Sequence, residues 1–251
     1  EALRLRDEKN YTFIHPFDDL AVATGQGSIA MEIVQELPTV DYIIVPIGGG
    51  GLITGISTLA KMLNPKIKVI GVEPAAAASM TAAFEKGEPV TLPSANTIAD
   101  GTAVKRVGET IFPYCKENIH KIITVDDNEL IGAFLDMVEN HKMIVENSGL
   151  LPVAALSHLD LKDKKAVVVL SGGNMDVITM SSIVQHGLIQ KDRIFSVSVL
   201  LPDKAGELVK VASIIAKEKG NVIKLEHNQF VSINRINAVE LRVTMEAYGT
   251  E

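Results

Sequence analysis

Four consecutive glycines, at residues 48–51, are the residues whose type and spacing most directly indicate chemistry. They follow the apolar, β-branched run 42–47, which is typical of a strand buried on both faces of a parallel sheet. From Leu52 onward the apolar residues recur at helical spacing, so the glycines form a turn between a strand and a helix. Such a turn can direct several backbone N–H groups at one anion, and the helix N-terminus adds its positive dipole end. The sequence therefore predicts a phosphate-binding turn.

The residues of this turn fit other interpretations less well. A turn that is merely tight needs one or two glycines, and each further glycine costs conformational entropy. The dinucleotide fingerprint G-x-G-x-x-G, counted from Gly48, fails because Ile53 stands where the third glycine belongs. The P-loop pattern fails because Ile56, rather than lysine, follows Gly55. Glu73 ends the next predicted strand, where a ribose-binding carboxylate would lie, so a nicotinamide-binding protein stays a third-ranked alternative.

Further polar residues stand at the ends of predicted strands or in the turns that follow them. They are Glu73, Glu146 and the residues of the turn 171–174, which reads Ser-Gly-Gly-Asn. In open α/β sheets the ligand lies outside the carboxyl ends of the strands. We therefore expect these residues to share one pocket with the glycine turn.

Strands and helices alternate along most of the chain, which predicts an α/β fold with a mostly parallel sheet flanked by helices. The expected strands are residues 11–15, 42–47, 68–72, 121–125 and 165–170. One helix is expected to start with Ser28 as its N-cap and to stop at Pro38. Another is expected to start with a capping box of Asp126 and Glu129 and to end near Lys142. The irregular segment 85–106 is a functional candidate because long loops are uncommon in compact domains.

The pattern changes near residue 191. Three strands (194–201, 221–230 and 238–245) and one helix (208–216) follow in the order β-α-β-β. This order predicts the first part of a small α+β domain. We place the boundary at residues 190–193, which gives domains of residues 1–191 and 192–251.

Composition limits the class of protein. The 251 residues, 47% of them hydrophobic and 22% charged, are typical of a globular chain. A net charge of -7 without a basic run argues against nucleic acid as a partner, and no apolar run approaches membrane-spanning length. One cysteine, Cys115, allows no internal disulfide and suits a reducing compartment, which indicates the cytoplasm. Because the chain begins with Glu1 and ends within a pattern, we expect a fragment of a longer protein.

Four motifs together resemble those of the threonine dehydratases (threonine ammonia-lyases), fold type II enzymes that depend on pyridoxal phosphate. In chain order they are Gly-Gly-Gly-Gly-Leu at 48–52, Gly-Val-Glu-Pro at 71–74, Ile-Ala-Asp-Gly at 98–101 and Ser-Gly-Gly-Asn at 171–174. The resemblance implies part of a tryptophan synthase β-like fold for residues 1–191. It also implies a truncated, ACT-like regulatory domain for residues 192–251.

The resemblance implies roles for these residues. The phosphate would be held by the backbone of Gly48, Gly49, Gly50, Gly51 and Leu52. Ser171 would hydrogen-bond the pyridine nitrogen, although a helix N-cap is its alternative interpretation. Glu146 would face the cofactor ring and relay a proton, and a salt-bridged surface carboxylate is its alternative. A monovalent or divalent cation would be bound by Glu73, the carbonyl of Ala77 and Ser79, because oxygen ligands suit a hard cation.

One family feature is missing from the sequence. The Schiff-base lysine of these enzymes lies in an S-F-K-x-R-G motif, and no lysine of this chain stands in that context. We therefore expect the chain alone to hold part of a cofactor site and to be inactive.

The resemblance implies the conversion of L-threonine to 2-oxobutanoate and ammonia under amino-acid regulation. Residues 202–208 resemble the loop at which ACT domains admit amino-acid effectors, with Gly206 allowing a carboxylate to approach backbone N–H groups. A homo-oligomer, dimer or tetramer, is implied. The near alternative is a serine racemase or serine dehydratase. The alternative from another class is a non-catalytic, amino-acid-sensing fragment, which would bind an effector but no cofactor.

Overall fold

The computed structural model describes residues 1–228 and 238–247. The chain divides into two compact units, Glu1–Asp176 and Val177–Glu251. The helix α8 (Val177–Gln190) begins the second unit. The domain boundary that we placed at residues 190–193 lies at the end of this helix and stays a prediction.

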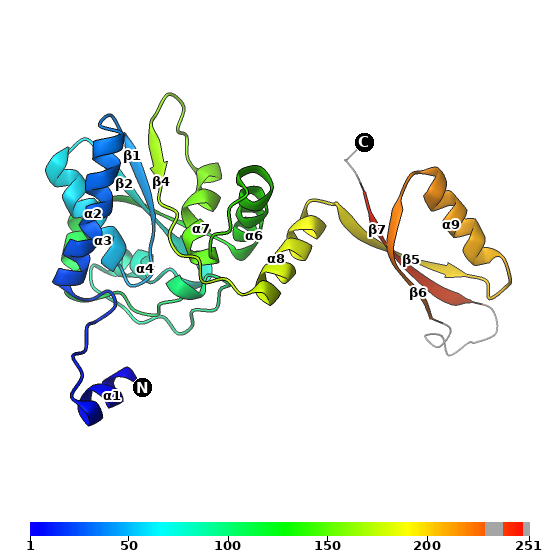
Figure 1. The fold of residues 1–251 in the computed structure, drawn as a ribbon, viewed down its shortest axis with the longest axis horizontal. Coiled ribbons are helices and arrows are strands. Elements are labelled where there is room, and N and C mark those ends of the chain that lie inside the picture. Colours follow the sequence, from blue (N-terminus) through cyan, green and yellow to red (C-terminus); the bar gives the residue numbers. More distant parts are fainter. Residues whose placement is uncertain (229–237, 248–251) are drawn as a thin grey trace. The chain divides into compact units, whose positions relative to one another are not determined.

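The first unit is built around a four-stranded parallel sheet in the order β3-β2-β1-β4 (Figure 1). Its strands are β1 (Tyr42–Pro46), β2 (Lys68–Pro74), β3 (Ile119–Val125) and β4 (Ala166–Val168). The central strand β1 is buried on both faces, and Ile43, Ile44 and Val45 are fully inaccessible to solvent. This burial explains the continuous apolar run and confirms the predicted parallel sheet.

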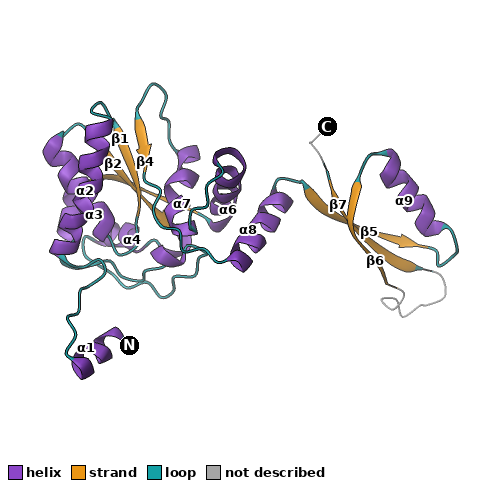
Figure 2. Cartoon of the chain, viewed as in Figure 1, coloured by secondary structure: helices purple, strands orange, loops and turns teal. Residues whose placement is uncertain are grey.

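Helices cover both faces of this sheet, as the sequence predicts. They are α2 (Leu20–Glu36), α3 (Gly51–Leu63), α4 (Ser79–Lys86), α5 (Phe112–Asn118), α6 (Asp127–Asp136) and α7 (Asn147–Ala154). Figure 2 shows α2 and α3 on one side of the sheet, with α6 and α7 on the other. Both α3 and α7 contact the central strands β1 and β2.

The predicted start of the second helix was wrong. α2 begins at Leu20, where the Asp19 side chain caps it, and Ser28 lies inside the helix. The nearby glycines serve close helix packing instead. A Cβ at Gly55 of α3 would lie 2.0 Å from the Ala23 carbonyl oxygen, and one at Gly27 would lie 3.4 Å from the Gly55 carbonyl oxygen. Glycine in this stretch therefore marks a helix crossing, which sequence pattern alone does not distinguish from a turn.

Other predicted elements had mixed outcomes. Residues 11–15 form no strand, because their β-propensity finds no neighbouring strand among the described residues. The capping box is confirmed: Asp126 accepts the N–H of Glu129 at 2.9 Å, and Glu129 accepts the N–H of Asp126 at 2.7 Å. Its helix continues beyond Asp136 as a π-helical turn, Met137–His141. The segment 85–106 is irregular apart from its start and the 3-10 turn Asp100–Thr102. Helices α5 and α8 were not predicted.

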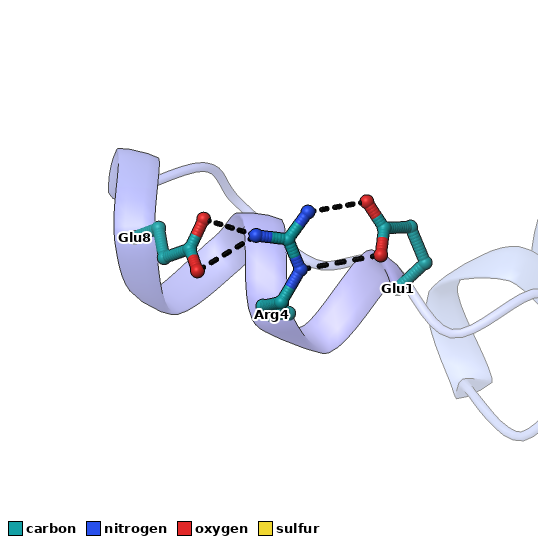
Figure 3. A network of polar contacts seen from close by, with 3 residues as sticks. All are labelled: Glu1, Arg4 and Glu8. Carbon is teal, nitrogen blue, oxygen red and sulfur yellow. Dashed lines mark hydrogen bonds and ion pairs between the residues drawn. The ribbon is translucent and has the colours of Figure 1, made fainter.

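The N-terminal helix α1 (Ala2–Lys9) has no buried residue. Arg4 lies between two carboxylates and contacts both Glu1 and Glu8 at 2.6 Å (Figure 3). All three side chains are exposed, so water screens these ion pairs and they contribute little to stability.

The second unit contains a three-stranded antiparallel sheet in the order β5-β7-β6. Its strands are β5 (Ile194–Leu201), β6 (Asn221–Asn228) and β7 (Val239–Glu246), and α9 (Glu207–Lys217) packs on one face. The core alternates along β7 through Val239, Leu241, Val243 and Met245. This confirms a small antiparallel sheet at the C-terminal end, while residues 229–230 of a predicted strand lie outside the described residues. Across the described ranges, no helix has the length and apolar character needed to cross a membrane.

Candidate functional site

A cavity of about 260 Å³ opens at the carboxyl ends of β1 and β4. It is lined by residues from five separate stretches of the chain, and these include most of the residues that the sequence singled out. The lining comprises Pro16, Phe17, Pro46, Gly48, Gly49, Gly50, Gly51, Leu52, Gly101, Thr102, Val104, Glu146, Ser148 and Ser171. The predicted site residues of the glycine turn, Glu146 and Ser171 therefore lie together.

Packing alone requires glycine at three positions of the turn. Gly50 has φ +102°, and a Cβ there would lie 2.6 Å from Ile111 Cδ1. A Cβ at Gly49 would lie 2.1 Å from Phe17 Cγ, and one at Gly51 would lie 2.8 Å from the Phe17 carbonyl oxygen. Packing therefore explains the glycines by itself, so their presence does not show that the turn binds an anion. Whether the turn can bind an anion depends on whether its backbone N–H groups are unpaired.

Those N–H groups are available. Among the hydrogen bonds of the described residues, none has a backbone N–H of residues 48–52 as its donor. The carbonyls of the turn are occupied, since Gly49 accepts from the N–H of Gly108 at 3.1 Å and Gly50 accepts from the N–H of Thr54 at 3.0 Å. Unpaired N–H groups at the start of α3 are the arrangement that binds an anion at a helix N-terminus.

Glu146 lies at the other side of the cavity, half-buried at the start of α7. Its Oε2 accepts the N–H of Asn174 at 2.9 Å, and its own N–H donates to the Gly172 carbonyl at 3.3 Å. Gly172 has φ +86°, and a Cβ there would lie 2.2 Å from the Glu146 carboxyl carbon. The carboxylate thus packs on the turn 171–174. It forms no ion pair within the described part of the chain, which removes the surface salt bridge as an explanation.

Ser171 does not cap a helix, because the next helix, α8, begins only at Val177. Its hydroxyl has no hydrogen-bonding partner among the described residues, although Ser171 lines the cavity. An unpaired hydroxyl on a residue that lines a cavity is available to hydrogen-bond a ligand atom.

The irregular segment supplies one wall of the cavity. Thr102 donates its hydroxyl to the Ala99 carbonyl at 3.0 Å and approaches the Ser148 hydroxyl at 3.4 Å. Asn147 donates to the Ile98 carbonyl at 2.9 Å. These contacts fix the segment against α7. Thr102 lies in the segment 85–106 that was a functional candidate but was not itself singled out, and Ser148, two residues after Glu146, was missed.

Glu73 does not share the cavity, which corrects our expectation of one pocket. Its carboxylate is fully buried and accepts the N–H of Met80 at 2.6 Å, the N–H of Thr81 at 2.8 Å and the Thr81 hydroxyl at 2.7 Å. Burial raises the pKa of Glu73, and these hydrogen bonds oppose the rise. A carboxylate occupied in this way is not free to bind a ribose.

Beside Glu73, Ala77 and Ser79 are also buried, and the Ser79 hydroxyl has no hydrogen-bonding partner. An unpartnered buried hydroxyl is uncommon and fits a site that lacks a ligand. Across residues 1–228 and 238–247, no cluster of three or more His, Cys, Asp or Glu side chains could hold a metal ion. A cation at Glu73 would therefore depend on carbonyl and hydroxyl oxygens for its remaining ligands.

Comparison with known proteins places this geometry in a family. The family model described as "Pyridoxal-phosphate dependent enzyme" matches residues 1–172, which contain the whole cavity. The chain belongs to this family. Pyridoxal phosphate carries a phosphate and a pyridine ring, which are the groups that the unpaired N–H groups and the Ser171 hydroxyl suit.

Relatives of this chain include threonine ammonia-lyases and serine racemases. An L-threonine ammonia-lyase of Geobacter sulfurreducens is 40% identical over 252 residues, covering 100% of this chain and 63% of the relative. The chain therefore spans less than two thirds of that relative. The structure of threonine deaminase isoform 2 from Solanum lycopersicum is 35% identical in sequence, with a TM-score of 0.69. The match covers 73% of this chain and 55% of the tomato chain. The structure of a serine racemase from Dictyostelium discoideum is 38% identical in sequence, with a TM-score of 0.64. The match covers 70% of this chain and 57% of the racemase chain.

Proposed function

We propose that this chain forms the phosphate- and ring-binding part of an L-threonine ammonia-lyase, which in full length converts L-threonine to 2-oxobutanoate and ammonia. One observation carries the proposal: residues 48–52, whose backbone N–H groups are unpaired, and Ser171, whose hydroxyl is unpaired, line one cavity. The 40% identity to an L-threonine ammonia-lyase supports threonine as the substrate.

In this proposal the residues have distinct roles. When bound, pyridoxal phosphate supplies an electron-withdrawing ring that stabilises charge developing on the substrate. The N–H groups of residues 48–52 hold the phosphate dianion at the start of α3. The Ser171 hydroxyl donates to the ring nitrogen without protonating it, which limits how strongly the ring withdraws electrons. Glu146, oriented by the N–H of Asn174, moves a proton at the cavity edge.

The lysine that carries such a cofactor is not among the residues that line the cavity in the described part of the chain. We therefore propose that this chain alone binds the cofactor without forming a Schiff base and has no activity. The active enzyme would combine this cavity with a lysine in the S-F-K-x-R-G context.

We also propose a cation at Glu73, the Ala77 carbonyl and Ser79. The unpartnered Ser79 hydroxyl supports it. The three hydrogen bonds that Glu73 already accepts argue for weak binding, because a cation would compete with them.

For the second unit we propose an ACT-like regulatory role with an amino-acid effector. Gly206 has φ +96° at the start of α9, and no atom lies within 4 Å of a Cβ placed there. The helix N-terminus is therefore open to a carboxylate. A homo-oligomer and a cytoplasmic location complete the proposal; the single, reduced cysteine supports the location.

A serine racemase is the second candidate, because a serine racemase shares 38% identity with the chain. One experiment separates the two. The full-length enzyme, loaded with pyridoxal phosphate, is given L-threonine and L-serine separately, and 2-oxobutanoate, pyruvate and D-serine are measured. We expect 2-oxobutanoate from L-threonine as the main product. D-serine as the main product would favour the racemase, and the absence of all three would overturn both.

A further inference from the structure

Residues 15–18 lie directly against the glycine turn, just before α2. The Phe17 ring occupies the space beside Gly49, where an added Cβ would come within 2.1 Å of it. The Phe17 backbone lies beside Gly51, whose Cβ would come within 2.8 Å of the Phe17 carbonyl oxygen. Both the ring and the backbone of Phe17 therefore contact the turn, so a shift of residues 15–18 would open the space against which the turn is packed.

Asp18 connects residues 15–18 to residues 109–111 by hydrogen bonds. Its carboxylate accepts three backbone N–H groups in succession, from Glu109 at 3.1 Å, Thr110 at 2.8 Å and Ile111 at 3.3 Å. A Cβ at Gly108 would lie 2.5 Å from Asp18 Oδ1, so glycine leaves room for the carboxylate. Hydrogen bonds to a charged acceptor are among the stronger ones in proteins.

The segment that Asp18 binds also contacts the glycine turn. The N–H of Gly108 donates to the Gly49 carbonyl at 3.1 Å. Gly49 is therefore held from two directions, by the Phe17 ring and by Gly108. Asp18 lies between these two contacts and links them, because it follows Phe17 in the chain and binds the residues that follow Gly108.

His15 shapes the same segment from within. Its Nδ1 accepts the N–H of Asp18 at 2.9 Å and the N–H of Phe17 at 3.4 Å, and its ring meets the Phe17 ring edge to face at 4.7 Å. These contacts make residues 15–18 a compact turn. Hydrogen bonds that fix the position of Asp18 therefore also fix the position of the Phe17 ring.

We propose that Asp18 is a positioning residue for the cofactor site: by joining residues 15–18 to residues 108–111, it keeps the glycine turn in the conformation that binds phosphate. Asp18 does not line the cavity, so its effect passes through Phe17 and Gly108. The inference rests on the proposed function only for the identity of the anion.

The chain offers a matched control in the neighbouring residue. The Asp19 carboxylate likewise accepts backbone N–H groups, from Ala21 at 2.7 Å and Val22 at 3.2 Å. It caps α2, and among the described residues its side chain forms no hydrogen bond with the glycine turn or with residues 108–111. Asp18→Ala and Asp19→Ala therefore both remove a carboxylate that accepts backbone N–H groups, but only the first removes the link to residues 109–111.

The first readout is amide hydrogen exchange in the 251-residue chain without any ligand. The Gly108 amide reports the bond to Gly49. We expect its exchange rate to rise roughly tenfold in Asp18→Ala and to change less than about twofold in Asp19→Ala. Equal changes in both variants, or no change in Asp18→Ala, would overturn the link between Asp18 and the turn.

The second readout is binding of pyridoxine 5′-phosphate and of pyridoxine, neither of which has an aldehyde that would react with lysines. We expect Asp18→Ala to weaken binding of the phosphate ester by roughly fivefold to tenfold, with little effect on pyridoxine. Asp19→Ala should leave both affinities near those of the unmodified chain. Equal weakening of both ligands by Asp18→Ala would overturn a role in phosphate binding.

If Asp18→Ala does not fold, Asp18→Asn keeps one acceptor oxygen and the shape of the side chain, and the same two readouts apply with smaller expected changes. If the unmodified chain binds neither ligand, the proposed cofactor site fails. Amide exchange still decides whether Asp18 holds the turn, so the two failures are distinguishable.

Discussion

Gly50 is the most constrained residue of the turn, since it has φ +102° and a Cβ added there would lie 2.6 Å from Ile111 Cδ1 and 2.8 Å from Met80 Cε. We expect Gly50→Ala to lower the free energy of unfolding by about 1–3 kcal/mol, because a side chain is strained in this conformation and has no space. Urea unfolding measures this. Gly173→Ala is the control, because no atom lies within 4 Å of a Cβ at Gly173. A stability loss as large in the control would contradict the steric explanation.

Cys115 lies behind the same turn, buried beside the Thr54 hydroxyl at 3.0 Å. Burial raises the pKa of the Cys115 thiol to about 12. We expect its reaction with a thiol reagent at pH 8 to be at least about a hundredfold slower in the native chain than in urea, because the thiolate is the reactive form. Rapid, stoichiometric labelling of the native chain would show that the thiol is accessible.

The raised pKa also links Cys115 to stability. A group whose pKa is higher in the folded state stabilises that state fully below its unfolded pKa and loses this contribution as pH rises through the folded value. The contribution of the protonated Cys115 thiol to the stability of the folded state is therefore complete below about pH 9 and is lost as the pH rises toward 12. We expect Cys115→Ala to show a shallower decline in stability than the unmodified chain between these values in urea titrations. Parallel curves would show that other groups cause the decline.

At the scale of elements, the crossing of α2 and α3 depends on glycine. We expect Gly55→Ala to destabilise the chain by about 1–3 kcal/mol, because the new Cβ would lie 2.0 Å from the Ala23 carbonyl oxygen and the helices must separate. Gly25→Ala on α2 has no atom within 4 Å of its Cβ and should stabilise by up to about 1 kcal/mol through helix propensity. Thermal unfolding of both variants tests this, and a neutral Gly55→Ala would mean that the crossing tolerates a side chain.

Elements buried on both faces were predictable from sequence, because a strand such as β1 has apolar residues on every side. Elements whose type depends on a neighbouring strand or helix were not predictable from sequence. Residues 11–15 have strand-forming residues but no described strand beside them, and Gly27 lies inside α2 facing the neighbouring helix α3 rather than in a turn. The start of α2 could have been found from Asp19, a residue type that favours N-caps.

The site was partly predictable for a related reason. Its backbone groups follow from a local pattern, four glycines between a strand and a helix, and the structure places them beside Glu146 and Ser171. Phe17, Thr102 and Asp18 reach the site only through contacts between residues far apart in the chain. Glu73 shows the converse, because its position at a strand end suggested the pocket but its carboxylate is directed to α4.

At the scale of the whole molecule, the cavity lies entirely within the first unit, Glu1–Asp176. The chain covers 63% of an L-threonine ammonia-lyase to which it is 40% identical. We expect incubation with pyridoxal phosphate and reduction with borohydride to label exposed lysines diffusely, as mapped by mass spectrometry. A single lysine labelled stoichiometrically and protected by inorganic phosphate would mean that this chain carries its own Schiff-base residue.

The phosphate role of the glycine turn is tested most directly by amide NMR spectra of the 251-residue chain during titration with pyridoxine 5′-phosphate. We expect the amide signals of residues 48–52 to shift saturably with the phosphate ester, and to shift far less with pyridoxine, because the unpaired N–H groups donate to the phosphate. Saturable shifts elsewhere in the chain with those five amides unchanged would show that the ligand binds at another site and that the glycine turn is only a tight connection.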